Sequence, residues 1–188
     1  MAFTTPGTAV AGDVLTATFY NVNVRDNMNA FRNNSGVVPP AARILMTSNF
    51  SIANDSHTSF TGFTSSNASE DFDTDSMVSL SATASCMTIN TAGIYQVNAM
   101  AAFPSGTSGT RFARIVRSRL GTITPLAVEE VVTSSGVQFS LAGCASFVVG
   151  DLIRLMVYQF SGAAMNLIAV NGEFSQTQVS AFMIGATS

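Results

Sequence analysis

The chain has 188 residues, enough for one domain and a short appendage, because domains usually hold about 100 to 150 residues. Charged residues make up only 10% of it against 47% hydrophobic residues, and all eight cationic side chains are arginine, a balance unlike the Glu- and Lys-rich surfaces of helical bundles. The net charge of −3 excludes the basic footprint of a nucleic-acid-binding protein, and no stretch approaches the roughly 18 apolar residues of a membrane span. We therefore expect a soluble protein made in the cytoplasm, with neither nucleic acid nor membrane as a partner.

Residues 1–36 are typical of an arm rather than of a folded domain. Pro6 and Gly12 interrupt any regular pattern near its start, and Thr16 then fits the N-cap of a helix. Apolar side chains follow at spacings of four, four and three residues: Tyr20, Val24, Met28 and Phe31. The pattern predicts one amphipathic helix of about four turns, which needs an apolar surface to lie on because so short a helix is marginal alone in water.

A proline-rich linker separates the arm from the rest of the chain. Pro39 and Pro40 hold the backbone extended and prevent a helix from continuing through them. We therefore predict three parts: a docking arm at residues 1–36, a linker at 37–41 and a single domain at 42–188.

The domain shows the periodicity of β-strands. In the stretch that begins at Gly93, an apolar set alternates with a more polar one, and the apolar set is Tyr95, Val97, Ala99, Ala101 and Phe103. Further strands are predicted at residues 42–46, 111–120, 137–141, 152–160, 163–168 and 179–184. Residues 104–109 are predicted to form a hairpin-type loop. Turn signals at roughly ten-residue spacing favour an antiparallel sandwich.

The strand predicted at residues 152–160 is apolar on both sides. One face of a sandwich strand normally meets water, so a strand of this kind needs a second burial partner. The economical partner is another copy of the chain. The outer set, predicted as a subunit interface, is Leu152, Met156, Tyr158 and Phe160.

Several short runs in the domain are similar to the complement-1q and tumour-necrosis-factor-like jelly rolls of bacterial and phage proteins. These runs are FDTDSM at residues 72–77, INTAGIY at 89–95, Arg114-Ile115, Gly150-Asp151, and the segments 157–159 and 161–162. The resemblance spans roughly residues 42–186 and implies an antiparallel jelly roll of about ten strands, assembled as a homotrimer.

The arm resembles an N-terminal segment of tailed-phage virion proteins, through residues 4–6, 12–17, Asn21 and 24–27. That likeness implies docking on a phage particle, on a major capsid protein or a tail protein. The residues assigned to docking on the virion are Thr4, Pro6, Leu15, Tyr20, Val24, Arg25, Met28 and Phe31.

Few side chains are spaced for chemistry. Asp71, Asp73 and Asp75 mimic the start of an EF-hand loop, but Ser76 and Ala82 stand where that loop needs Gly and Glu. The alternatives are a looser calcium site at the three aspartates and a solvated turn. His57 lacks any nucleophile-elbow sequence around it, so we predict no catalytic residues, and we expect no cofactor.

Two further groups of side chains favour structural roles. Cys86 and Cys144 have neither a CxxC spacing nor a histidine nearby, which argues against zinc, and we interpret them as buried free thiols, with a disulfide between them as the alternative. Four arginines lie close together in sequence and favour a solvated or subunit-facing strand over an anion site: Arg111, Arg114, Arg117 and Arg119.

The sequence therefore predicts a non-enzymatic structural protein on the surface of a tailed-phage virion. In this hypothesis a homotrimer docks through its arms and serves as a capsid decoration protein. The alternatives are a tail-tip or tail-fibre trimer that binds a receptor or glycan, and a hydrolase built on His57.

Overall fold

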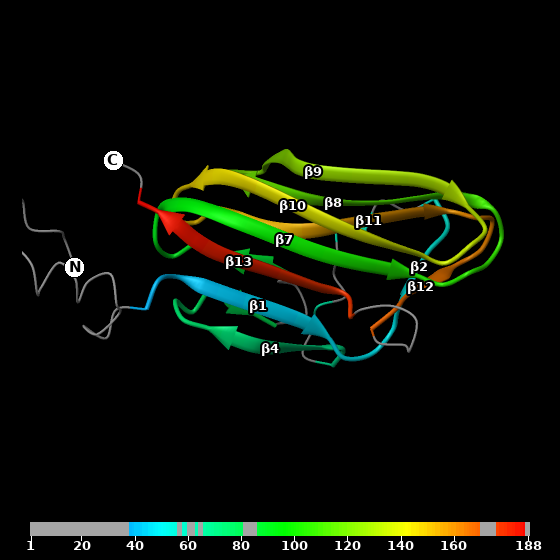
Figure 1. Ribbon diagram of the computed structural model, residues 1–188, viewed down its shortest axis with the longest axis horizontal. Helices are drawn as coiled ribbons and strands as arrows, with labels where there is room; N and C mark the ends of the chain where they lie inside the picture. The colour runs from blue at the N-terminus through cyan, green and yellow to red at the C-terminus, as the bar shows by residue number, and fades with distance from the viewer. Residues whose placement is uncertain are drawn as a thin grey trace, which may run out of the picture. The chain divides into compact units, whose positions relative to one another are not determined.

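The computed structural model describes residues 38–55, 58–59, 63, 66–80, 86–169 and 176–186. Thirteen strands form in this part of the chain, all within the compact unit that begins at Pro40 (Figure 1). The first six are β1 (Ala41–Met46), β2 (Phe50–Ile52), β3 (Thr58–Ser59), β4 (Ala68–Asp73), β5 (Val78–Ser79) and β6 (Cys86–Thr88). The others are β7 (Gly93–Phe103), β8 (Gly109–Arg119), β9 (Thr122–Thr133), β10 (Val137–Phe147), β11 (Leu152–Phe160), β12 (Met165–Leu167) and β13 (Gln178–Gly185).

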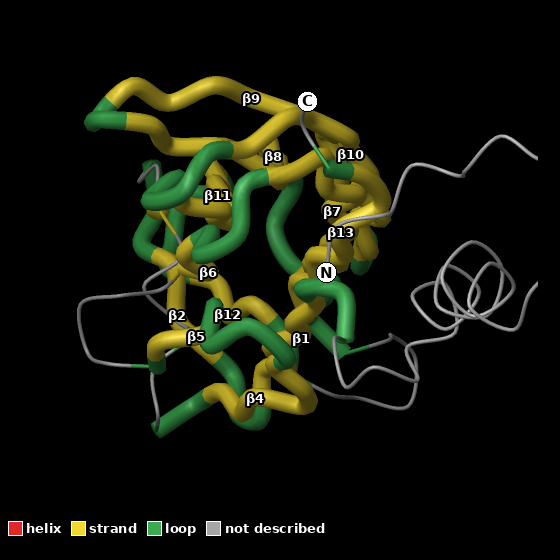
Figure 2. The backbone as a smooth tube through the Cα atoms, turned by 90° about the vertical axis from the view of Figure 1, so that its left-hand side faces the viewer, coloured by secondary structure: helices red, strands yellow, loops and turns green. Residues whose placement is uncertain are grey.

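The strands pair antiparallel in two large sheets and one small one. One sheet has the order β10-β7-β13-β1-β4 and the other the order β5-β6-β11-β8-β9, with β3 paired to β11. Strands β12 and β2 form a separate pair. Figure 2 shows β7 and β13 on one side of the sandwich and β11 and β6 on the other.

The core lies between the two large sheets. Tyr95, Val97 and Ala101 of β7 are fully buried, as the alternation in the sequence predicts. They pack with the inward-facing side chains of the other strands, among them Ile44 of β1 and Leu155 of β11. A strand that buries every second residue points the remaining residues outward, so the core also determines which side chains each sheet exposes.

The loop at residues 104–109 corrects the sequence-based expectation of a hairpin. Strand β7 belongs to the five-stranded sheet and β8 to the six-stranded sheet, so the loop crosses between layers. Sequence spacing alone does not distinguish a hairpin from such a crossing, because both need a short polar connection. Gly109 has to be glycine here, since a Cβ at this position would lie 1.9 Å from the carbonyl oxygen of Phe160.

The structure explains why the segment Gly93-Ile94-Tyr95 begins with glycine and ends with tyrosine. A Cβ on Gly93 would lie 2.8 Å from the carbonyl oxygen of Gly185 on β13, so only glycine allows the two strands to pair this closely. Tyr95 is fully buried, donates its hydroxyl to the carbonyl oxygen of Thr91 at 2.7 Å, and packs edge-on against Phe147. Burial, together with the charge of Asp75, raises the pKa of Tyr95 to about 12.

The arm and its predicted helix, residues 1–36, lie outside the described residues. Within the described part of the chain no helix is long and apolar enough to cross a membrane.

Gly93 offers a test of the packing between β7 and β13. We expect Gly93→Ala to lower the free energy of unfolding by about 1 to 3 kcal/mol, because the added methyl group meets backbone that cannot easily move. Gly185→Ala is the matched control on the partner strand, where a Cβ would make an ordinary contact of 3.9 Å with Ile94 and leave stability within about 0.5 kcal/mol of wild type. Urea denaturation measures both, and equal stabilities of the two variants would contradict this account of the segment.

Candidate functional site

The outward side of the five-stranded sheet is the most distinctive surface of the domain. Its central rows run across β10, β7 and β13, where directly paired residues point the same way: Ser140, Met100 and Gln178; Ala142, Asn98 and Ser180; Cys144, Gln96 and Phe182. We call these nine side chains the five-strand face. None of the three strands carries Asp, Glu, Lys or Arg along its whole length.

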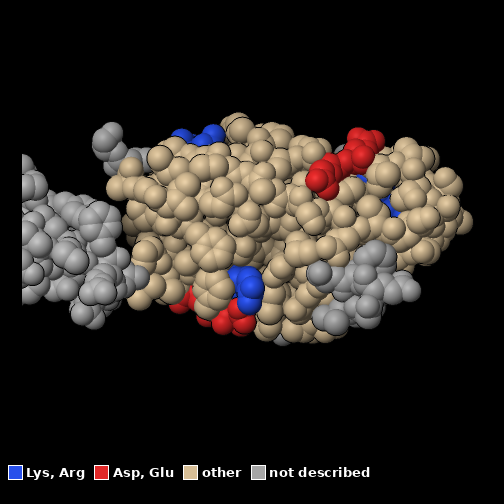
Figure 3. Space-filling model, in the orientation of Figure 1, with Lys and Arg blue, Asp and Glu red and all other residues tan. Residues whose placement is uncertain are grey.

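Charged groups stand at the borders of this face rather than on it. Figure 3 shows a wide uncharged area over β7, β10 and β13, with charged side chains toward its edges. Arg43 of β1 pairs with Asp71 of β4 and lies over the ring of Phe72, with 5.6 Å between the guanidinium carbon and the ring centroid. Phe72 in turn contacts Phe182 at a centroid distance of 5.9 Å, which joins the apolar edge of the face to the ion pair.

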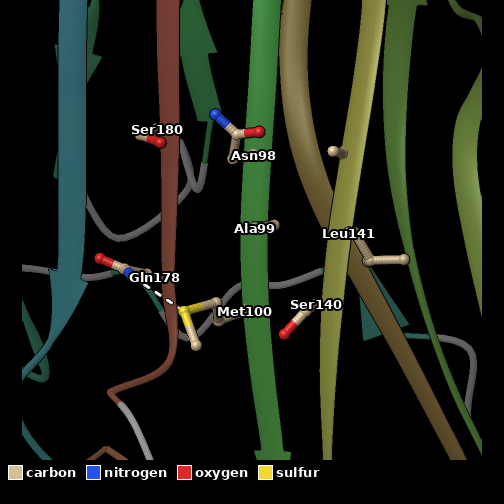
Figure 4. A pocket seen from close by; sticks show the side chains of 8 residues that line it. Asn98, Ala99, Met100, Ser140, Leu141, Gln178 and Ser180 are labelled. Carbon is tan, nitrogen blue, oxygen red and sulfur yellow. Dashed lines mark hydrogen bonds between the residues drawn. The ribbon is translucent and has the colours of Figure 1, made fainter.

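A shallow depression of about 290 Å³ lies within the face (Figure 4). Its polar wall comes from Asn98, Ser140, Gln178 and Ser180, and Met100 crosses its floor, where Gln178 Nε2 donates to the Met100 sulfur at 3.0 Å. The lining offers no titratable group to activate a nucleophile or transfer a proton. An uncharged surface with one hollow is suited to packing against another protein surface.

The residues predicted from sequence as a subunit interface lie on the opposite sheet. Leu152, Met156, Tyr158 and Phe160 share the outward side of β11, with Phe160 51% exposed and Met156 only 6% exposed. Tyr158 stacks on Phe112 at 5.3 Å and donates its hydroxyl to Asp55 at 2.9 Å. Met156 is thus buried within the single chain, so its apolar character does not need a second copy; the assignment of these four residues to an interface stays a prediction.

The three aspartates of the loosely predicted calcium site are engaged in different contacts. Asp71 pairs with Arg43, whereas the two oxygens of Asp73 accept the backbone N–H groups of Asp75 at 3.1 Å and Val78 at 2.7 Å. One oxygen of Asp75 is buried without a hydrogen-bond partner. No three potential metal ligands of the described residues lie close enough together to hold an ion.

The arginines of β8 do not form one solvated surface. Arg111 is wholly buried, which corrects the expectation, and its guanidinium donates to the carbonyl oxygens of Ser135 and Thr107 in two neighbouring loops. Burial lowers the pKa of Arg111. At the other end of the strand, Arg117 donates to the carbonyl oxygen of Ser146.

Arg119 makes a two-pronged ion pair with Asp151, in the turn between β10 and β11. The Arg119 Nε and Nη2 atoms lie 2.7 and 2.6 Å from the two oxygens of Asp151, whose carboxylate also accepts the N–H of Val148. Asp151 is 1% exposed. The hydrogen bonds from Arg119 hold the pKa of Asp151 below its ordinary value, despite the opposing effect of burial. The pair ties the six-stranded sheet to the turn that leads out of the five-stranded one.

The remaining assignments made from the sequence concern the two cysteines, His57 and the docking residues of the arm. Cys144 is exposed on the five-strand face, so its interpretation as a buried thiol is wrong. The side chains of Cys86 and His57 lie outside the described residues, as do the docking residues between Thr4 and Phe31.

Comparison with known proteins supports the fold. No protein-family model matches the sequence, and no curated protein is significantly similar to it. Among solved structures, Eiger TNF from S. frugiperda superimposes with a TM-score of 0.55 at 11% identity, covering 80% of this chain and 96% of that one. Murine APRIL, crystallised at pH 8.0, superimposes with a TM-score of 0.55 at 14% identity, covering 78% of this chain and all 100% of that one.

The chain therefore has an all-β, antiparallel, TNF-like jelly-roll fold, which confirms the predicted fold class. The described residues form thirteen strands, whereas the resemblance seen in the sequence implied about ten for the whole jelly roll. Three of the thirteen lie in the segment 50–79 and have only two or three residues each: β2, β3 and β5. At these identities the likeness concerns the fold alone.

The ion pair of Asp151 predicts a pH-dependent stability. Asp151→Asn removes the charge but keeps the side-chain volume, and we expect it to lower the free energy of unfolding by about 2 to 3 kcal/mol near neutral pH, in the range of hydrogen bonds to charged groups. Because the folded pKa of Asp151 is lowered, this contribution is complete above about pH 5 and is lost as the pH falls through the folded pKa.

The measurement is urea denaturation of the wild type and the variant at about pH 7 and about pH 3, with the difference between them shrinking at the lower pH. Glu70→Gln, at an exposed position on β4, is the control and should change stability by less than about 0.5 kcal/mol. A difference that stays constant across this pH range would show that the charge of Asp151 does not stabilise the fold.

Proposed function

We propose that this chain is a non-enzymatic structural protein of a tailed-phage virion. In this proposal it is a homotrimer, made in the host cytoplasm and docked on the particle surface through its N-terminal arm, as a capsid decoration protein. The observation that carries the self-association is the charge-free five-strand face of the jelly roll.

The five-strand face supports self-association better than the outer side of β11. Burying a charged side chain without a partner costs several kcal/mol, and the outer side of the six-stranded sheet carries Arg114 and Arg154 beside the predicted interface residues. Strands β7, β10 and β13, which carry the five-strand face, have no such group, and the face includes small side chains such as Ala142 and Ser140 that permit close approach. In a closed ring of three identical subunits, each copy contacts its two neighbours through two different parts of its surface, and no contact is left open.

A structural role agrees with how the described residues use their charges. Asp151, Asp71 and Arg111 are each engaged in contacts that hold strands or loops together, rather than gathered around a cavity. The hollow on the five-strand face is lined by the hydroxyl groups of Ser140 and Ser180 but by no acid or base that could activate them. The TNF-like fold is compatible with a non-enzymatic protein.

The virion assignment rests on the arm and the linker. Residues 4–6, 12–17 and 24–27 resemble the N-terminal segment of virion proteins, and Pro39 and Pro40 separate this arm from the domain. A jelly-roll head joined to a docking arm through a proline-rich linker favours decoration of the capsid over a tail fibre. Decoration proteins commonly bridge neighbouring capsid subunits, so the major capsid protein is the proposed partner and a tail protein the alternative.

The five-strand face is tested by introducing one charge at its centre. We expect the wild type to have a mass in solution three times the 19.6 kDa of the chain, and Ala142→Arg, at an exposed position that leaves the protomer intact, to yield monomers. Val128→Arg places the same charge on β9, where Val128 is 54% exposed, and should remain trimeric. Light scattering measures the masses.

Alkylation of Cys144, located by peptide mass spectrometry, gives an independent measure of the same interface. Cys144 should react slowly in the wild type and rapidly in the Ala142→Arg monomer, because it lies on the five-strand face. A wild-type monomer, or a trimer in which Cys144 reacts at the rate of a free thiol, would contradict self-association through this face.

The virion role is tested with the arm. We expect removal of residues 1–36 to leave a folded trimer that no longer binds phage particles lacking this protein, since the arm supplies the predicted docking residues. Co-sedimentation with such particles, made by deleting the gene from the phage, measures binding of the full chain and the truncated one. If the full chain fails to sediment with them, the virion role fails; if the truncated chain still binds, docking lies in the jelly roll alone.

A further inference from the structure

The turn between β8 and β9 holds a leucine where the fold gains nothing from one. Strand β8 ends at Arg119 and β9 begins at Thr122, and these two residues pair, so Leu120 and Gly121 form a two-residue hairpin loop. Leu120 has a φ of +49° and Gly121 a φ of +83°. The relative exposure of Leu120 is 103%, the highest of the large apolar residues in the described part of the chain.

Both properties of Leu120 are unfavourable in the isolated domain. A loop with positive φ at both central residues is the type I′ turn, which prefers Asn or Gly at its first position because a larger side chain is strained there. A leucine in water contributes no burial to offset that strain. Strain that folding does not explain is a reason to look for a function.

The same end of the sandwich carries most of the other exposed aliphatic side chains. The strand registers place the start of β1, the start of β7, the end of β8, the end of β10 and the end of β13 together, as Figure 1 also shows. We call this end of the sandwich the arm end, because the chain before Val38 joins the domain there. Its exposed members besides Leu120 are Ile94, Ile123, Val148, Val149 and Ile184, whereas the opposite end has Val132 and Phe160.

Two of these aliphatic side chains project from turns. Leu120 is at the tip of the β8–β9 hairpin, and Val149 stands in the turn before Gly150, whose φ of +88° fits the third position of a type II turn. Val149 is 64% exposed. Arg119 pairs with Asp151 beneath the two turns, and Arg117 of the same strand donates to the carbonyl oxygen of Ser146, so one positive charge remains beside the pair. The arm end thus exposes the aliphatic side chains of Leu120 and Val149 above the Arg119–Asp151 ion pair.

We propose that the arm end is a second contact with the particle, in which Leu120 inserts into an apolar pocket of the shell protein and Val149 packs beside it. The inference rests on the proposed virion function. The chain leaves the domain at this end, and the predicted docking residues of the arm extend to Phe31, so the nine residues from Arg32 to Pro40 span at most about 32 Å. An arm bound to the particle therefore keeps the arm end within about 32 Å of the docked Phe31.

A protein pocket fits this surface better than the other apolar partners. A membrane-binding tip is usually accompanied by a basic surface of several Lys or Arg side chains, whereas the arm end has Arg117 beside the paired Arg119 and Asp151, in a chain with a net charge of −3. A second copy of the chain already has the five-strand face as its proposed contact. Aliphatic side chains that project from tight turns fit pockets in a folded partner protein, because the turn fixes the position of the side chain before binding.

The test separates binding from folding through the strain at Leu120. Asn is favoured at positive φ, so we expect Leu120→Asn in the full-length chain to raise the midpoint of thermal unfolding by about 2 °C and to leave the trimer mass unchanged. The same variant should bind particles lacking the protein at least about tenfold more weakly, as expected when a buried leucine anchor is lost. Val149→Thr should weaken binding in the same direction.

Val132→Thr is the matched control at the opposite end of β9, where Val132 is 68% exposed, and it should bind as the wild type does. Wild-type affinity of Leu120→Asn would overturn the inference, and if the arm truncation still abolished binding the virion function would stand. If the Leu120→Asn trimer dissociates, the inference is wrong and Leu120 instead contacts a neighbouring subunit. If the wild type sediments with phosphatidylcholine vesicles but not with particles, the inference is wrong and the arm end instead binds lipid. Failure of the wild type to bind particles removes both proposals.

Discussion

The burial of one side of β7 is the constraint on which the rest of the structure depends. This strand lies between β10 and β13, and its inner residues, from Tyr95 to Phe103, fill the space between the two large sheets. Because side chains alternate strictly along a strand, that burial commits Gln96, Asn98 and Met100 to the outside. A shift of one residue in register would exchange the two sets, and the fixed glycine contact at Gly93 opposes such a shift.

Period-two patterns explain what the sequence could predict. The bounds of the strand at residues 152–160 match β11, and the alternation that begins at Gly93 matches the buried side of β7, because both patterns follow directly from packing one side of a sheet. The crossing of residues 104–109 between layers was not predictable, since a loop's sequence carries no information on which sheet the next strand joins. Arg111 was also misjudged, because its burial depends on carbonyl groups of loops that lie far from it in sequence.

The five-strand face was missed for a related reason. Its residues appear in sequence only as the polar alternates of three strands separated by long stretches of chain, and only their pairing brings them into rows. The available signal was an absence: residues 93–103, 137–147 and 178–185 contain no charged side chain, whereas the strands of the other sheet contain arginines and glutamates. The sequence instead directed attention to β11, where Met156 is buried within the chain but Phe160 is 51% exposed, so the predicted interface there stays a prediction.

The proposed trimer and the proposed contact of the arm end depend on each other through symmetry. A cyclic trimer places equivalent points of its three subunits at one level along the axis, so three arms and three copies of Leu120 face the same surface. Burying one leucine contributes only about 2 kcal/mol, which is too little for stable attachment by itself. Linked contacts bind at a high effective concentration once the first has formed, and weak individual contacts then give a tight complex. Self-association through an uncharged sheet face would therefore be the step that makes small, strained tips such as Leu120 effective in binding.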